Sequence, residues 1–264
     1  MSTVPFTAPA PAGTLRLPRL SRGRAQIGVF VLAYVVYSIA RWLTVGELPD
    51  ATANALWIVD REREFALDVE GPVQDALTGS VALWILNHLY LAAQLVVLPG
   101  ALYLLYRKSR QAYERLRNTI LATWLLSIPV YALFPVAPPR LADIGMVDTI
   151  TQQTGFAMDS KLTTSFYNEL AAVPSLHVGF AFAIGIAIAA ASSNRLVKLL
   201  AHLWGPAIAL AVVATGNHYV FDIAAGMAAA AIGYGLGHLA SDPARLRGLV
   251  SRDGHRNHLL HQAA

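Results

Sequence analysis

The sequence contains no cysteine and few charged residues. None of its 264 residues is a cysteine, which excludes disulfide bonds and thiolate metal sites and leaves the redox compartment open. Charged side chains make up 14% of the chain, against about 25% in a typical soluble protein. With 55% hydrophobic residues and a mean hydropathy of +0.47, the composition is that of a membrane protein.

A nucleic-acid partner is not expected, although the net charge is +4. The basic residues cluster at the ends of apolar runs, which is where membrane orientation places them. The apolar runs also leave little sequence for a soluble domain outside the bilayer.

Apolar runs predict six membrane-spanning helices, each close to the length of about 20 residues that crosses a bilayer. They cover residues 26–45, 81–106, 118–135, 175–192, 196–215 and 217–239. The first run has a rival interpretation as a cleaved signal peptide, because residues 51–53 resemble a cleavage site. Its apolar core is long for a signal peptide, so we predict an uncleaved span.

The expected fold class is therefore all-α, a polytopic membrane helix bundle. A single membrane-embedded domain covers residues 26–240, between a flexible cytoplasmic tail (1–25) and a polar cytoplasmic tail (241–264). Residues 47–79 differ from the spans, because acidic and apolar residues alternate there with helix-like spacing. We predict an amphipathic helix lying on the membrane surface in this stretch.

The distribution of lysine and arginine predicts the orientation. Most of the 20 basic residues fall on the side of the termini. The five on the opposite side are Arg41, Arg61, Arg63, Arg140 and Lys161. The positive-inside rule then places both termini in the cytoplasm and predicts a cell-membrane protein. Arg140, His177 and His218 are all expected at the outer face.

Two histidines and a carboxylate are expected to meet at that face. About forty residues separate His177 from His218, enough for one helix across the bilayer and one back. Asp222 follows His218 by one helical turn and shares its face. This arrangement suits His218 as a nucleophile or base oriented by Asp222. His177 can donate a proton to a leaving oxygen.

Arg140 and Ser175 are the candidate phosphate-binding residues. The Arg140 guanidinium follows two prolines at the headgroup level, where it can hold a phosphate bidentately. An interfacial anchor or a salt bridge to a loop carboxylate is the alternative. Ser175 and the amides after it begin a span, and a helix N-terminus is an anion site. Simple capping by Ser175 is compatible with that role.

Other interpretations of these polar residues carry less weight. Metal binding and a buried structural His–Asp pair compete with catalysis, but a His-x-x-x-Asp pair alone is a weak metal signal. The convergence of three polar stretches favours a catalytic site with no metal. Asn87 and Tyr90, near the outer end of the second span, either contact a lipid headgroup or form ordinary hydrogen bonds between helices.

Three stretches carry a resemblance to a known family: FPVAPPRL (134–141), VPSLHVG (173–179) and GNHYVFD (216–222). They resemble the three signature motifs of the type 2 phosphatidic acid phosphatase superfamily, and within it the branch that resembles inositol phosphorylceramide synthases. The resemblance extends over roughly residues 50–240. It implies that His218 forms a phosphohistidine oriented by Asp222, while His177 protonates the leaving group. It also implies that Arg140 and the Ser175 region hold the phosphoryl oxygens and that no cofactor is needed.

The sequence departs from the family pattern at several positions. Leu133 stands where the first motif usually has lysine, and Leu141 replaces the usual proline. Ala211 and Val212 stand where the third motif often has Ser-Arg. Leu176 occupies a position that is commonly glycine in simple phosphatases. Fewer cations near the phosphate favour a phosphodiester or lipid headgroup, which carries less charge than a monoester dianion.

The sequence thus predicts a membrane enzyme that hydrolyses or transfers a phosphoryl or phospho-headgroup group on a lipid. The partner is a membrane lipid, and the acceptor is either water or an alcohol such as inositol. The alternative is a lipid transporter or flippase using the same polar residues, but the broken spans in matched halves that typify transporters are not seen. A catalytically silent scaffold is disfavoured by the intact His177, His218 and Asp222.

Overall fold

A computed structural model describes residues 22–43, 46–158, 160–166 and 168–240. Over these residues the chain is helical and contains no β-strand, as the composition predicts. The chain divides into two compact units, residues 1–36 and 37–264. The first helix, α1 (Arg22–Leu43), begins in the first unit and is apolar enough to cross a membrane. The two predicted cytoplasmic tails lie almost entirely outside the described residues.

The second unit contains the remaining helices. In chain order they are α2 (Leu48–Glu64), α3 (Glu70–Leu77), α4 (Val81–Ala92), a π-helical turn (Ala93–Val97), α5 (Leu98–Lys108), α6 (Arg110–Leu133), a 3₁₀ turn (Pro139–Leu141), α7 (Thr149–Thr154), α8 (Lys161–Phe166), α9 (Leu176–Ala191), α10 (Arg195–Ala214) and α11 (Val220–Ala240). α4, the π-helical turn and α5 follow one another without a break.

Each of the six predicted spans contains a helix, although the described residues 134–135 and 217–219 at the ends of two spans are not helical. Among the described residues, five helical segments are long and apolar enough to cross a membrane: α1, Val81–Lys108, α6, α10 and α11. The sixth, α9, is apolar but has only 16 residues, which at about 1.5 Å per residue is shorter than a bilayer core. The apolar helices support the predicted membrane protein, and the count of six spans stays a prediction because α9 is short.

The third predicted span begins earlier than its apolar run. We expected the basic cluster 107–117 to lie outside the helix, but α6 starts at Arg110, directly after Ser109. The Ser109 hydroxyl accepts a hydrogen bond from the Ala112 N–H and caps the helix. The first residues of α6, before the apolar run at 118, therefore form a polar extension that carries Arg110, Arg115 and Arg117.

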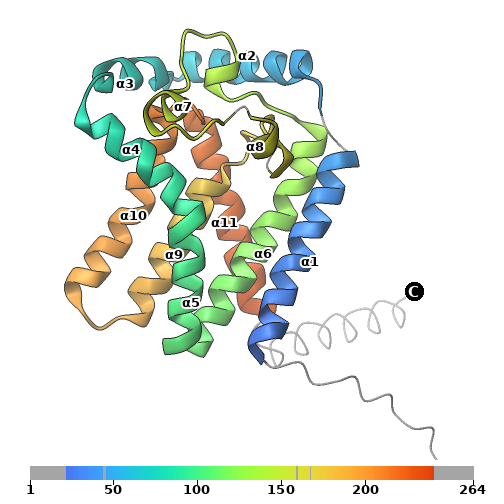
Figure 1. Ribbon diagram of the computed structural model, residues 1–264, viewed down its shortest axis with the longest axis vertical. Helices are drawn as coiled ribbons and strands as arrows, with labels where there is room; N and C mark the ends of the chain where they lie inside the picture. The colour runs from blue at the N-terminus through green and yellow to red at the C-terminus, as the bar shows by residue number, and fades with distance from the viewer. Residues whose placement is uncertain (1–21, 44–45, 159, 167, 241–264) are drawn as a thin grey trace, which may run out of the picture. The chain divides into compact units, whose positions relative to one another are not determined.

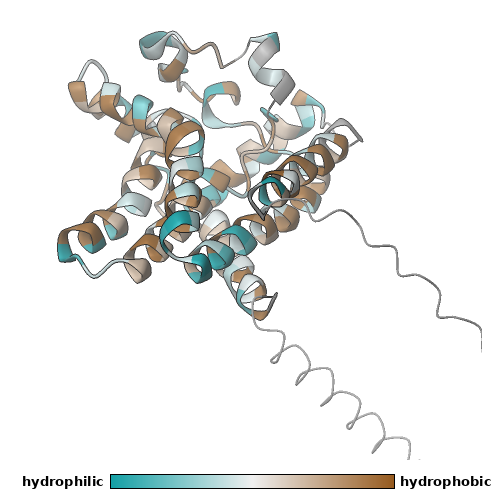
Figure 2. Cartoon of the chain, turned by 60° about the horizontal axis from the view of Figure 1, so that its bottom comes forward, coloured by the Kyte–Doolittle hydropathy of each residue, from teal (hydrophilic) through white to brown (hydrophobic). Residues whose placement is uncertain are grey.

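The apolar helices of the second unit pack as a bundle. α11 lies against α6 and α9, while α10 lies against α9 and α4. Hydrophobic residues extend along the outside of these helices (Figure 2). On α10, for example, Leu199, Leu200 and Leu203 are all more than half exposed. An exposed apolar surface of this kind is suited to contact with lipid.

Short helices and loops cover one end of this bundle. α2, α3, α7 and α8 gather at the end where α9 and α11 begin, drawn at the top of Figure 1. The turns between α5 and α6 and between α9 and α10 lie at the opposite end. We call these four helices the covering layer. It lies at the end of the bundle that carries the 3₁₀ turn with Arg140, the first turn of α9 with His177, and His218 just before α11.

The stretch 47–79 forms two helices where we predicted one. α2 ends in a Schellman motif: Ala66 has a positive φ of 53°, Ala66 N–H donates to Arg63 C=O, and Leu67 N–H donates to Glu62 C=O. α2 buries Ala51, Ala55 and neighbouring residues against the loops of the covering layer. The amphipathic pattern is correct, but its apolar face packs on protein.

Candidate active site

Backbone hydrogen bonds join the three motif stretches to one another. Arg140 N–H donates to Gly216 C=O at 2.9 Å, which connects the first stretch to the third. Ser175 N–H donates to Asp222 C=O at 3.1 Å, which connects the second stretch to the third. The main chain therefore joins the three stretches that carry the candidate residues.

His218 and Asp222 form the predicted pair. His218 Nδ1 lies 3.1 Å from Asp222 Oδ2, and the two side chains are 8% and 0% exposed. Asp222 Oδ2 also accepts a hydrogen bond from the Tyr219 N–H at 3.0 Å. A carboxylate on Nδ1 favours the tautomer with a proton on that nitrogen, so Nε2 keeps its lone pair. An imidazole in this state can attack an electrophile.

His177 lies opposite this pair, in the first turn of α9. The ring centroids of His177 and His218 are 6.1 Å apart and their planes are inclined by 56°. Both rings are thus near enough to act on one phosphorus atom. The Tyr90 ring stacks on His177 with centroids 4.1 Å apart and an interplanar angle of 19°. Tyr90, for which the sequence left open a headgroup contact or a hydrogen bond between helices, thus packs against the ring of His177.

Arg140 is oriented by a residue that the sequence analysis did not select. Its Nε donates to Asn217 Oδ1 at 3.1 Å. Asn217 is itself held, because its Nδ2 donates to Thr215 Oγ1 at 2.9 Å and to Thr215 C=O at 3.2 Å. The sequence alone gives no signal for this contact, because the two residues are 77 positions apart and meet only in the folded chain.

Ser175 is fully buried and caps α9. Its Oγ accepts a long hydrogen bond of 3.4 Å from the Val178 N–H. Capping is therefore the contact present in the structure. Phosphate binding at the amides that begin α9 stays a prediction, with the physical basis that the first N–H groups of a helix have no intrahelical acceptor.

Asn87 contributes to the fold beneath the site. It is fully buried, and its Nδ2 donates to Thr149 C=O at 3.2 Å and to Gln153 Oε1 at 2.9 Å. Its Oδ1 accepts from Thr149 Oγ1 at 2.8 Å. These contacts favour the alternative of ordinary hydrogen bonding between helices, here α4 and α7, over a lipid headgroup contact.

Two buried glutamates reach the start of α11, and neither was singled out from the sequence. Glu70 Oε1 accepts from the Val220 N–H at 2.8 Å, and Glu62 Oε1 accepts from the Phe221 N–H at 2.6 Å. Burial raises the pKa of the Glu62 carboxyl from 4.5 to about 8; the Phe221 N–H opposes this rise, and the charges of Glu70 and Asp222 add to it.

The part of the chain that the structure describes holds no group of three or more histidine, aspartate or glutamate side chains arranged to bind a metal ion.

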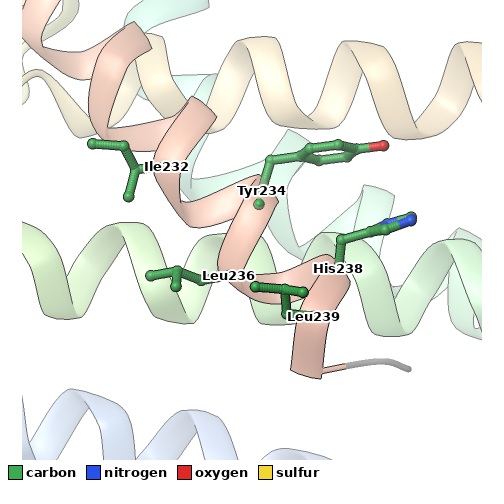
Figure 3. Close-up of a pocket in the computed structure, with 6 residues that line it drawn as sticks. Ile232, Tyr234, Leu236, His238 and Leu239 are labelled. Atoms are coloured by element: carbon green, nitrogen blue, oxygen red, sulfur yellow. The ribbon is translucent and has the colours of Figure 1, made fainter. Parts of the chain in front are cut away.

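A separate groove of about 490 Å³ lies along the C-terminal half of α11 (Figure 3). Ile232, Tyr234, Leu236, His238 and Leu239 line it together with Gly235. None of the candidate catalytic residues takes part in this groove.

Comparison with known proteins agrees with the three motif stretches. A family model described as the PAP2 superfamily matches residues 56–236, well over half of the chain. Neither the curated proteins nor the solved structures contain a match. The matched range begins within α2 and includes the rest of the covering layer and all three motif stretches.

Proposed function

The chain belongs to the PAP2 superfamily, and from this premise we propose that it hydrolyses or transfers a phosphoryl or phospho-headgroup group on a membrane lipid through a phosphohistidine. Members of this superfamily are phosphatases and phosphotransferases, so enzymatic phosphoryl chemistry follows from membership. The identity of the nucleophile, the substrate and the acceptor belong to the proposal. The observation that carries it is the distance of 6.1 Å between the ring centroids of His177 and His218, together with the contact of Asp222 Oδ2 with His218 Nδ1.

The first step uses His218 as the nucleophile. Its Nε2 attacks phosphorus, the bond from phosphorus to the leaving oxygen breaks, and His177 donates a proton to that oxygen. Asp222 stabilises the positive charge that develops on the imidazole of His218. The Arg140 guanidinium and the amides at the start of α9 stabilise the negative charge on the remaining phosphoryl oxygens.

The second step releases the phosphoryl group from His218. His177, now neutral, accepts a proton from water or from an alcohol, whose oxygen attacks phosphorus. The phosphorus–nitrogen bond breaks and His218 returns to its starting state. Water yields hydrolysis. An alcohol such as inositol yields a new phosphate ester, which is a diester when the group on His218 already carries one ester. The two outcomes use the same residues and differ only in the acceptor.

The surroundings of the site support a substrate of low charge. Val212, at the position where the family motif often has arginine, is fully buried and packs with Val178 and Ile208. A phosphate monoester carries close to two negative charges near neutral pH, whereas a diester carries one. With apolar packing in place of a cation, we propose a phosphodiester or lipid headgroup substrate, as in the branch that resembles inositol phosphorylceramide synthases.

We further propose that the site opens at the outer face of the cell membrane. The end of the bundle with the α5–α6 and α9–α10 turns carries Arg107, Lys108, Arg110, Arg195 and Lys198. The positive-inside rule assigns that end to the cytoplasm. We propose the same side for both termini, because arginines precede the first span and follow the last in the sequence. On the opposite end, the exposed Trp57 and Phe65 rings of the covering layer suit contact with the membrane surface.

The test is turnover by the purified protein with a panel of labelled phospholipids, with and without inositol. We expect His218→Ala to abolish turnover and His177→Ala to lower it by about 10²–10⁴-fold. His202→Ala is the matched control, because His202 is exposed on α10 away from the site. Phosphate or a phosphate monoester formed without inositol indicates hydrolysis, and a new phospholipid that requires inositol indicates transfer. Undiminished turnover by His218→Ala would refute the proposal.

A further inference from the structure

The first turn of α11 receives its hydrogen-bond acceptors from other parts of the fold. The first N–H groups of a helix have no intrahelical acceptor, and a serine, threonine, aspartate or asparagine at the N-cap usually supplies one. Tyr219 precedes α11 and is not one of these residue types. Its hydroxyl donates to Ala137 C=O at 3.1 Å and does not cap the helix. Glu70 of α3 and Glu62 of α2 bind the next two N–H groups, those of Val220 and Phe221.

These two N–H groups lie between the candidate nucleophile and its orienting carboxylate. The contact between His218 Nδ1 and Asp222 Oδ2 spans this turn, so its geometry depends on the turn being closed. We propose that Glu62 and Glu70 are positioning residues for the nucleophile: by binding the first turn of α11 they hold His218 and Asp222 in line with His177. This inference rests on the proposed function of His218.

The environment of the pair is unusual for glutamates that serve only the fold. Glu62 is 3% exposed and Glu70 is 5% exposed. Among the described residues no ion pair includes either of them, and the neighbouring arginines of α2 pair with Glu64, Asp60 and Asp68 on the exposed side. Burial of carboxyl groups without a cation is costly. A single polar N-cap residue would close the helix at lower cost.

The two glutamates project from elements that are themselves attached to the site. Near the start of α2, Ala51 C=O accepts from Ala137 N–H at 3.0 Å, close in sequence to Arg140. On α3, Gln74 Nε2 donates to Ala214 C=O at 3.2 Å, at the end of α10. The pair thus connects the start of α11 to the loop of Arg140 and to the end of α10.

Several titratable groups face Glu62, and together they determine how the pair responds to pH. Glu70 lies on α3, Asp222 on α11 and Tyr219 between α10 and α11. Burial raises the pKa of the Tyr219 hydroxyl, and the charges of the neighbouring carboxylates add to this rise. Like charges in a buried cluster favour retention of a proton on one carboxyl group. As pH rises through about 8, Glu62 ionises and adds a negative charge beside Glu70 and Asp222.

The experiment compares glutamine and alanine variants of the full-length protein. Glutamine keeps an oxygen that accepts the backbone N–H and removes the titration, whereas alanine removes both. For Glu62→Ala and Glu70→Ala we expect kcat to fall by about 10–100-fold with little change in KM, because misplacement of a catalytic group by about 1 Å has this effect. For Glu62→Gln we expect a kcat near that of the wild type at neutral pH. At alkaline pH, we expect the fall in kcat of this variant to begin at a higher pH than in the wild type.

The matched control is Glu64→Ala, since Glu64 lies on the same helix but is exposed and paired with Arg61. Hydrogen exchange at the amides of residues 220–223 provides a readout that does not require turnover. Both alanine variants are expected to accelerate this exchange, and the control is not.

The outcomes separate this inference from the proposed function. If His218→Ala is inactive while Glu62→Ala and Glu70→Ala keep the kcat and the pH profile of the wild type, the positioning role is refuted and the proposed function stands. If His218→Ala stays active, the proposed function is refuted, and with it the positioning of a nucleophile. Equal losses in Glu62→Gln and Glu62→Ala, with unchanged exchange, also contradict the inference.

Discussion

At the scale of single residues, the guanidinium of Arg140 is held in a fixed orientation by a hydrogen bond. Its Nε donates to Asn217 Oδ1, and a guanidinium carries further N–H groups in the same plane that can bind phosphate oxygens. Lysine has the charge but cannot make both contacts in a fixed geometry.

We therefore expect Arg140→Lys to lower kcat/KM by about 10–100-fold, which corresponds to the loss of a charge-assisted hydrogen bond of about 1.5–3 kcal/mol. Steady-state kinetics with the preferred phospholipid measures this loss. Arg63→Lys, at an exposed position on α2, is the control and should be neutral. Equal activity of Arg140→Lys and the wild type would show that only the charge matters.

Glu62 predicts a dependence of stability on pH. Its pKa is raised to about 8 in the folded protein from an ordinary 4.5, so between these values the folded state keeps a proton that the unfolded state has lost. The free energy of unfolding therefore falls as pH rises through this window, by at most about 1.4 kcal/mol per pH unit from this group.

Glu62→Gln removes this contribution. We expect thermal unfolding in detergent to show a smaller decline in Tm for the variant than for the wild type between about pH 5 and about pH 8. Glu64→Gln, on the exposed side of α2, should follow the wild type. Parallel Tm curves for the wild type and Glu62→Gln would contradict the assignment of a retained proton to Glu62.

The burial of Glu62 could have been predicted from the sequence, whereas that of Glu70 could not. Ala51, Ala55 and Ile58 define the apolar face of α2, and the same spacing continues to Glu62. The alternation of acidic and apolar residues in 47–79 instead suggested one amphipathic helix on the membrane surface. Glu70 follows a change of chain direction at Ala66, and no periodicity extends across such a turn.

At the scale of elements, apolar runs predict helices well but locate their ends poorly. Hydropathy identified the core of each span, because about 20 apolar residues have few other uses. It could not show that α6 begins at Arg110, since a capped polar turn outside the bilayer is invisible to hydropathy. The His218–Asp222 contact was predictable because it lies within one turn, whereas the Arg140–Asn217 contact depends on loops that meet only in the folded chain.

The close approach of α11 to the start of α9 leads to a prediction for Gly226. A Cβ atom at this position would collide with the carbonyl oxygen of Ser175, and the Cβ of a residue at Gly179 would lie 2.8 Å from the carbonyl oxygen of Gly226. Backbone atoms cannot move aside as a flexible side chain can. Alanine at position 226 must therefore displace α11 from the turn that carries Ser175 and His177.

We expect Gly226→Ala to reduce both Tm and kcat, with a loss of stability of about 1–3 kcal/mol. Gly235→Ala is the matched control on the same helix, because a Cβ there meets no atom within 4 Å. That control should keep its activity and gain slightly in stability, since alanine favours a helix by about 1 kcal/mol over glycine. Wild-type kinetics in Gly226→Ala would show that the contact does not position the site.

At the scale of the whole molecule, the second unit combines an apolar bundle with a polar covering layer at one end. The apolar helices bury their small residues against one another and expose leucines, while side chains of α2 and α3 form hydrogen bonds with the end of α10 and the start of α11. This division explains why one end of the bundle carries candidate chemistry and the other carries basic residues. The orientation of the bundle in the membrane therefore determines whether the site meets lipids of the outer or of the inner leaflet.

The absence of cysteine allows a direct test of that orientation. Single cysteines can be introduced without removing any native thiol, so every labelled position is unambiguous. Gln152 is exposed on α7 in the covering layer, and Ser193 is exposed in the turn between α9 and α10 at the opposite end.

We expect a membrane-impermeant maleimide to label Gln152→Cys in intact cells, and to label Ser193→Cys only after permeabilisation, because the basic residues beside Ser193 place that turn in the cytoplasm. The cysteine-free parent should stay unlabelled in both conditions, and both variants must keep their turnover. The reverse pattern would place the site at the cytoplasmic face and its lipid substrate in the inner leaflet. Labelling of both positions in intact cells would mean that neither end is protected by the membrane, which contradicts a spanning bundle.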